Sequence, residues 1–183
     1  MSYYADLDVS VLDELPPGRT PVVTRLAGEA RRDEVIARVH SACRAGGQAY
    51  CWGDGFSGQL GFGGQDQQSE PIDVSGGQKF SRIAAGGKHT CALTTAGKAF
   101  CWGANESGQV GDGSKSDRGS PVAVSGGQAF TEIAIGGNHS CGLTGGGEVY
   151  CWGENRQGQL GDGTKADRNR PVVEREYLDR LLR

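Results

Sequence analysis

The chain has 183 residues and a formal net charge of −3, so it lacks the strongly basic surface typical of nucleic-acid-binding proteins. No apolar run approaches the ~20 residues that a membrane-spanning helix needs, and the N-terminus lacks the basic start and apolar stretch of a signal peptide. We therefore expect a cytoplasmic location and no membrane contact. Only four of the 32 glycines precede residue 51, which predicts two parts of different origin.

The first fifty residues have the pattern of a short α/β segment. An alternating strand is predicted at residues 7–12, then a Pro-Pro-Gly turn and a second strand at residues 22–26. A helix is expected over residues 31–44, because Val35, Ile36, Val39 and Cys43 fall on one helical face. The alternative is that residues 41–48 supply the missing outer strand of the repeat that follows. We favour the helix, since its apolar stripe is already complete.

This segment resembles RecG-type ATP-dependent DNA helicases over residues 5–22 and 31–39. In that family the stretch leads from the first motor lobe into the second. The family pattern ends at Cys51, where a motor motif should follow and Cys-Trp-Gly stands instead. No Gly-Lys-Ser/Thr phosphate loop occurs, and the acidic motif and the arginine finger have no counterpart. We therefore expect no ATP hydrolysis and no catalytic residue.

From Cys51 onward the sequence repeats every 50 residues. Cys-Trp-Gly at residues 51–53 recurs at 101–103 and 151–153. Each copy continues with a Gly-Gln-Leu/Val-Gly turn and with a proline that is expected to open a short strand (Pro71, Pro121, Pro171). A period of this length with several short strands is typical of a β-propeller. The recurring tryptophans Trp52, Trp102 and Trp152 are expected in the blade core rather than as stacking platforms for bases or sugars.

Two hairpins can be aligned by counting. A three-residue loop at residues 95–97 places Cys91 opposite Cys101, and a loop at residues 145–147 places Cys141 opposite Cys151. Each pair could form a disulfide, whereas reduced, buried thiols are the alternative in cytoplasm. A loop at residues 45–47 would place Ser41 opposite Cys51, so Cys43 and Cys51 are predicted to be unpaired.

Residues 51 to about 173 resemble the repeats of the regulator of chromosome condensation family, in the cysteine-containing form found in exported bacterial proteins. The resemblance rests on Cys-Trp-Gly, Gly-Gln-Leu-Gly-Asp-Gly and His-Ser/Thr-Cys-x-Leu-Thr. It implies propeller blades that serve as docking surfaces, and one branch of the family is an exchange factor for a small GTPase. None of the exchange-factor residues can be placed on this sequence. Members typically close a ring of seven blades, whereas this chain holds about two and a half repeats.

Two metal-binding interpretations are weighed against simpler ones. His89 and His139 each precede a cysteine by two residues, but structural zinc sites usually gather two close ligand pairs, so hydrogen bonding at a blade edge is favoured. The Gly-Asp-Gly turns around Asp112 and Asp162 could offer oxygens to calcium, but calcium loops need several carboxylates and the first copy has Phe62 there. We expect no metal and no cofactor.

The predicted fold is therefore mainly β, an incomplete β-propeller of about two and a half blades preceded by a short α/β segment with one helix. The expected domains are residues 1–50 and 51–183, with a charged tail from about 174. We predict a non-enzymatic protein-interaction module that binds a protein partner or itself through open blade edges. The alternatives are an inactive fragment of a RecG-type helicase from DNA repair, and a fusion with no selected function.

Overall fold

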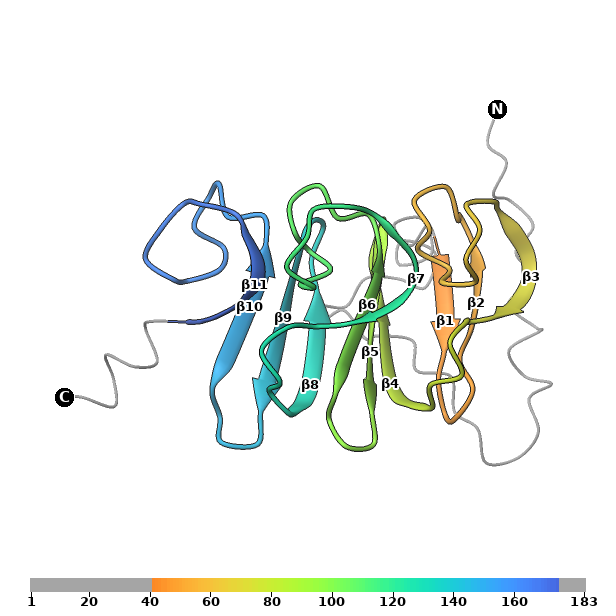
Figure 1. Cartoon of the computed structure of the whole chain (residues 1–183), viewed down its shortest axis with the longest axis horizontal. Helices are drawn as coiled ribbons and strands as arrows, with labels where there is room; N and C mark the ends of the chain where they lie inside the picture. The colour runs from red at the N-terminus through yellow and green to blue at the C-terminus, as the bar shows by residue number, and fades with distance from the viewer. Residues whose placement is uncertain (1–40, 175–183) are drawn as a thin grey trace, which may run out of the picture.

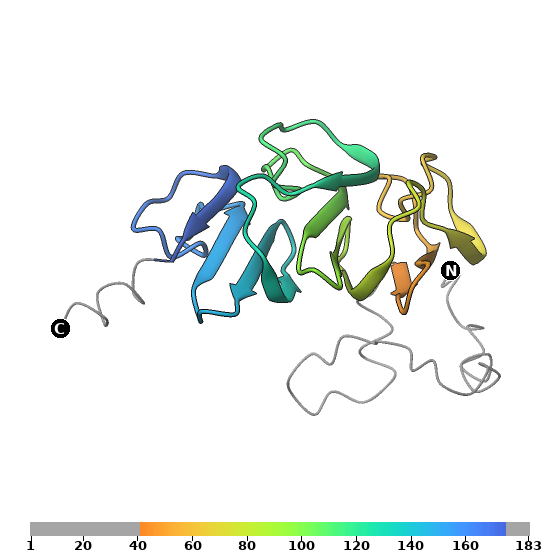
Figure 2. The ribbon, with the colours of Figure 1, turned by 60° about the horizontal axis from the view of Figure 1, so that its bottom comes forward.

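Three antiparallel sheets stand side by side in the computed structural model, which describes residues 41–174 (Figure 1). Unit 1 contains β1 (Ser41–Arg44), β2 (Tyr50–Gly53) and β3 (Gln68–Asp73). Unit 2 contains β4 (Phe80–Ala85), β5 (His89–Thr94), β6 (Ala99–Gly103) and β7 (Arg118–Ala123). Unit 3 contains β8 (Phe130–Ile135), β9 (His139–Thr144), β10 (Val149–Gly153) and β11 (Arg168–Val173). Figure 2 shows the same row after rotation, with units 1 and 3 at opposite ends. The fold is thus mainly β and an incomplete propeller, as predicted.

The central hairpins of units 2 and 3 have the predicted register. Cys91 lies opposite Cys101 and Cys141 lies opposite Cys151. The structure joins each pair by a disulfide with Cα atoms 4.1 Å apart. The bonds therefore lie within single hairpins and do not connect one sheet to another.

The hairpin of unit 1 contradicts two predictions. Cys43 lies opposite Cys51 and is bonded to it, although both were expected to be unpaired. The counting failed because it placed the loop of unit 1 as in the other hairpins, although the bonded cysteines are 8 residues apart here and 10 apart in units 2 and 3. The predicted helical ending was also wrong, because residues 41–44 form β1. Ladder pairing to β2 and the bond to Cys51 outweigh the local helical spacing.

The prolines of the repeat lie inside strands rather than at their first residues. Pro71, Pro121 and Pro171 are each the fourth residue of β3, β7 and β11. These strands are at the edges of their sheets and pair on one side only, so a missing N–H breaks no ladder there.

The hydrophobic core lies between the units rather than within them. One cluster joins Cys51, Leu60 and Val74 of unit 1 to Phe80 and Trp102 of unit 2. The second cluster repeats this arrangement one unit later, with Leu93, Val110 and Val124 packed against Phe130 and Trp152. Each sheet is therefore stabilised mainly by its neighbours.

Several predicted elements lie outside the described residues. They are the strands at 7–12 and 22–26, the helix up to residue 40 and the tail beyond residue 174. Strand β1 precedes the domain boundary expected near residue 50 and is hydrogen-bonded to β2 beyond it. In the part of the chain that is described, no helix has the length and apolar character to cross a membrane.

The disulfide of unit 1 gives the first testable prediction. Replacing Cys43 and Cys51 together by alanine should lower the free energy of unfolding of the oxidised protein by about 2–3 kcal/mol, because a closed loop of this length restricts the unfolded chain by that amount. The Cys91/Cys101 double variant is the matched control and should lose a similar amount. Thiol titration of the unreduced, denatured wild type should find no free thiol. Two free thiols in the wild type would restore the unpaired assignment.

Candidate interaction surface

A shared backbone carbonyl joins unit 1 to unit 2. The carbonyl oxygen of Gln59 accepts a hydrogen bond from the Trp102 indole N–H at 2.9 Å and another from the Thr90 hydroxyl at 2.9 Å. All three residues are fully buried. A buried carbonyl with two donors is fully satisfied, so this contact fixes the position of one sheet against the next.

The junction between units 2 and 3 repeats this arrangement. The Gln109 carbonyl accepts from Trp152 Nε1 at 2.8 Å and from the Ser140 hydroxyl at 3.0 Å. Trp102 and Trp152 therefore act as donors between sheets, in addition to filling the core as predicted. The prediction was wrong for Trp52, which is partly exposed and belongs to neither core cluster.

The Gly-Gln-Leu/Val-Gly turn explains how the buried Gln59 carbonyl is placed to accept the indole N–H of the next unit. The Gln59 side chain accepts the Ser57 N–H at 2.9 Å and holds the turn. Gly61 has a φ of 76°, and a Cβ atom there would lie 2.6 Å from Trp102 Nε1. Glycine is thus required both by the left-handed backbone and by the closeness of the indole.

A second backbone contact supports each junction. The Gly63 N–H donates to the Gly119 carbonyl at 2.8 Å, and the Gly113 N–H donates to the Asn169 carbonyl at 2.9 Å. Each turn therefore packs on the last strand of the following unit.

At the end of unit 3 the same surface has no following unit among the described residues. We call it the Gln159 end and define it by Leu143, Val149, Gly158, Gln159 and Gly163. Leu143 and Val149 are partly exposed, whereas Leu93 and Ala99, which hold the equivalent positions in unit 2, are 1% and 3% exposed. Nothing lies closer than 4.0 Å to a Cβ atom built on Gly158.

At the other end of the row, unit 1 presents the opposite half of the junction. We call it the Trp52 end and define it by Trp52, Ala42 and Ser69. Trp52 is partly exposed, whereas Trp102 and Trp152 are fully buried. Ala42 is opposite Trp52 in the ladder, as Thr90 is opposite Trp102, and it has no hydroxyl to donate.

The Gly-Asp-Gly turns of units 2 and 3 use their carboxylates internally. Asp162 accepts hydrogen bonds from the Thr164 hydroxyl at 2.7 Å, from Arg168 Nε at 2.7 Å and from Asn155 Nδ2 at 3.0 Å. Burial by itself raises the pKa of Asp162, but these bonds outweigh it and lower the pKa to about 2. Asp112 makes the same contacts with Ser114 and Arg118. Both carboxylates thus stabilise their own turns, a role that differs from the calcium binding weighed above.

Unit 1 has none of the side chains that form this network in units 2 and 3. The residues at the five positions of Asn105, Asp112, Ser114, Asp117 and Arg118 are Gly55, Phe62, Gly64, Gln67 and Gln68. The neighbouring Phe56 is 65% exposed, which sets it apart from the other large apolar residues of the described part. The turn of unit 1 is therefore held by backbone contacts and by the Gln59 and Asp54 side chains, which accept backbone N–H groups, rather than by an ion pair.

His89 lies buried at the junction of units 2 and 3. Its Nε2 is 2.9 Å from the Ser140 hydroxyl. Burial, with a smaller contribution from His139, lowers the pKa of His89 to about 4. His139 is half-buried and its pKa is also lowered, mainly by burial. The neighbouring cysteines are all in disulfides, and no three metal-binding side chains come together in residues 41–174.

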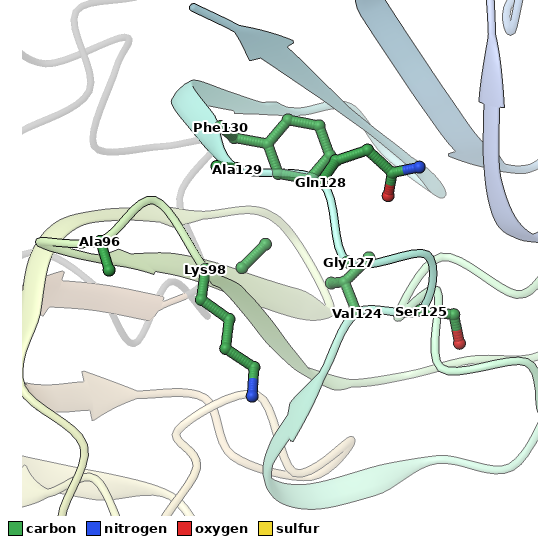
Figure 3. Close-up of a pocket in the computed structure, with 9 residues that line it drawn as sticks. Ala96, Lys98, Val124, Ser125, Gly127, Gln128, Ala129 and Phe130 are labelled. Carbon is green, nitrogen blue, oxygen red and sulfur yellow. The ribbon is translucent and has the colours of Figure 1, made fainter.

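A small cavity of about 160 Å³ lies between the β5–β6 hairpin and the segment that leads to β8 (Figure 3). Ala99, Val124 and Phe130 contribute apolar surface, and Lys98 is its one ionisable lining residue. The Lys98 amino group lies 5.3 Å from the centre of the Phe100 ring. A single cation offers no acid–base pair for catalysis.

Counting along the sequence located the three tryptophans and the cysteines but missed the acceptors. The Gln59 and Gln109 carbonyls belong to the backbone, so the residue type by itself does not show that they accept a hydrogen bond. The signal that could have revealed them was the invariable glutamine before Leu60, Val110 and Leu160.

The family described as Regulator of chromosome condensation (RCC1) repeat matches residues 46–93, 96–143 and 146–175. The chain is also similar to the ATP-dependent DNA helicase RecG of Escherichia coli strain K12, with 56% identity over 52 residues, and to that of Pasteurella multocida, with 65% identity over 43 residues. These matches cover 28% and 24% of this chain. The chain spans only 8% and 6% of the length of these two relatives.

Two solved structures share the fold. Human WBSCR16 superposes with a TM-score of 0.66 and 26% identity over 73% of this chain and 35% of that one. Prp20p from Saccharomyces cerevisiae, described with its binding to Gsp1p and histones, superposes with a TM-score of 0.63 and 20% identity over 74% of this chain and 36% of that one.

The indole hydrogen bond can be tested by comparing two tryptophans. Trp102→Phe should lower the free energy of unfolding by about 1–2 kcal/mol, because it removes a buried donor while the ring is largely replaced. Trp52→Phe is the matched control and should cost less, since no described residue accepts from its indole. Denaturant unfolding measures both. Equal losses would show that ring volume, not the hydrogen bond, matters.

The depressed pKa of His89 predicts a pH dependence of stability. Unfolded His89 takes up a proton near pH 6.5, whereas folded His89 does so only near pH 4. The unfolded state therefore binds the proton first as the pH falls, and stability should decrease between pH 6.5 and 4 by up to about 1.4 kcal/mol per pH unit. His89→Gln should flatten this slope, and the His139→Gln control should retain most of it. An unchanged slope in His89→Gln would contradict the assignment.

Proposed function

This chain belongs to the family of Regulator of chromosome condensation (RCC1) repeats, and on that basis we propose that it is a non-enzymatic protein-interaction module. The binding surfaces are the Gln159 end and the Trp52 end of its open array. Proteins that stack repeats bury apolar surface between neighbours, and within residues 41–174 no further unit covers the corresponding surface of unit 3, so we assign it to a partner.

The exposure of Leu143 and Val149 is the observation that carries the proposal. Their equivalents Leu93 and Ala99 are buried by the aromatic residues of the next unit. The same surface in unit 3 presents Leu143 and Val149 partly exposed, has the Glu174 side chain beside Gly161, and is bordered by hydrogen-bonding backbone groups. This combination is typical of protein–protein contact surfaces.

The structural relatives support a protein partner. Prp20p is described with its binding to Gsp1p and histones, and yeast RCC1 (Prp20) has been solved with Kap60 bound to it. Those partners are protein molecules, and we extend only that general property to this chain.

A second candidate function follows from the helicase similarity. Identity of 56% over 52 residues to RecG favours a fragment that took part in DNA repair. The absence of a Gly-Lys-Ser/Thr sequence argues against ATP turnover by this chain. ATPase activity above background with branched DNA would favour this second function.

A binding comparison tests the preferred function. Immobilised wild type should retain protein partners from an extract of the source cells, and Leu143→Asp should reduce that retention at least tenfold, because it places a charge on the apolar surface. Phe56→Asp is the control, since it places the same charge on a more exposed apolar residue in the turn of unit 1. Equal retention by all three proteins would contradict the proposal.

A further inference from the structure

We propose that one partner is a second copy of this chain, which docks its Trp52 end on the Gln159 end of the first. This inference rests on the proposed function and names the occupant of one of its surfaces. The resulting contact would repeat the indole and backbone hydrogen bonds of the junction that the chain already contains twice.

The internal junctions show that the two ends are complementary. Each junction joins a carbonyl and an apolar surface on one unit to an indole donor and a last-strand carbonyl on the next. The Gln159 end has the carbonyl and, in Leu143 and Val149, part of the apolar surface, and the Trp52 end has the indole and the last-strand carbonyl. Among the described residues, the Trp52 end has no counterpart of Phe80 and Phe130, because the sheet of unit 1 begins at β1. Because unit 3 holds its glutamine turn as units 1 and 2 do, with Gln157 N–H donating to the Gln159 side chain at 2.9 Å, the acceptor is preformed.

The expected contacts follow by position. The Trp52 indole N–H of the second copy would donate to the Gln159 carbonyl, as Trp152 donates to Gln109. The Gly163 N–H would donate to the Ser69 carbonyl of the second copy, as Gly113 donates to Asn169. Leu143 and Val149 would then become buried, as Leu93 and Ala99 are.

Two substitutions weaken this junction relative to the internal ones: Ala42 at the position of Thr90 and Ser140, and Glu174 at the position of Val74 and Val124. Ala42 replaces Thr90 and Ser140, so the second donor to the carbonyl is lost. A Cβ atom on Gly161 would meet the Glu174 side chain at 2.5 Å, whereas the equivalent atoms on Gly61 and Gly111 would meet an indole. Glu174 therefore lies where the incoming tryptophan must pack. Association should consequently be reversible and dependent on concentration.

The contact is heterologous, because it joins two different surfaces. Copies joined by such an interface can add further copies at their free ends, unless the rotation between successive copies closes a ring. A symmetric dimer that used either end twice would not satisfy the indole and carbonyl together.

Sedimentation equilibrium of the purified full-length chain tests the proposal. The wild type should associate as its concentration rises. Trp52→Ala and Leu143→Asp should each sediment as monomers near 19.2 kDa. Mixing the two variants should restore a complex of one copy of each, because one retains an intact Gln159 end and the other an intact Trp52 end. A symmetric interface predicts no such rescue.

A variant that strengthens association provides a test that misfolding cannot imitate, because misfolding would only weaken association. Ala42→Thr restores the missing donor and should tighten association about fivefold, the effect of one ordinary hydrogen bond. Phe56→Ala should leave association unchanged. Monomeric wild type at all concentrations, or failure of the mixed variants to combine, would overturn the head-to-tail contact. If the extract experiment still showed retention that Leu143→Asp abolishes, the proposed function would survive this result.

Discussion

A hydrogen bond from a tryptophan indole to a backbone carbonyl sets the arrangement of the whole array. Gln59 and Gln109 each offer a buried carbonyl, and the tryptophan of the following unit donates to it. The positive φ of the adjacent glycine, the close approach of the indole and the hydroxyl of Thr90 or Ser140 all serve this one contact. The two core clusters form around it, so the burial of the apolar side chains of each unit depends on its neighbour.

Much of this architecture could be predicted from the period of the sequence. A spacing of 50 residues gave the propeller class, and hairpin counting gave the registers of Cys91 with Cys101 and of Cys141 with Cys151. These predictions succeeded because the side-chain period of a strand is two and the loop lengths are equal. They depended on geometry that units 2 and 3 share.

Unit 1 was predicted poorly because it departs from the repeat in ways that counting cannot detect. Its hairpin is two residues shorter, which shifted the expected partner of Cys51 from Cys43 to Ser41. The apolar spacing that includes Cys43 suits a helix, yet residues 41–44 pair with β2, since tertiary pairing overrides local preference. The junction acceptors were missed for another reason, because a backbone carbonyl leaves no residue-type signature.

The polar networks of the turns illustrate how a repeat can preserve shape while it changes chemistry. Asp112 and Asp162 hold their turns through an arginine and a hydroxyl. Unit 1 replaces every member of this set together, and its turn still presents the Gln59 carbonyl to Trp102. The network thus stabilises only its own turn, whereas the carbonyl contact is common to both junctions.

The disulfides close only 8 or 10 residues of chain, and none passes from one sheet to another. Each block of 50 residues therefore contains all of its own covalent cross-links and both halves of a junction. Gene duplication or deletion of a whole block would leave every cysteine with its original mate and every remaining junction with its original chemistry. Selection can in this way alter the number of blades by recombination alone, without a compensating change at any other codon.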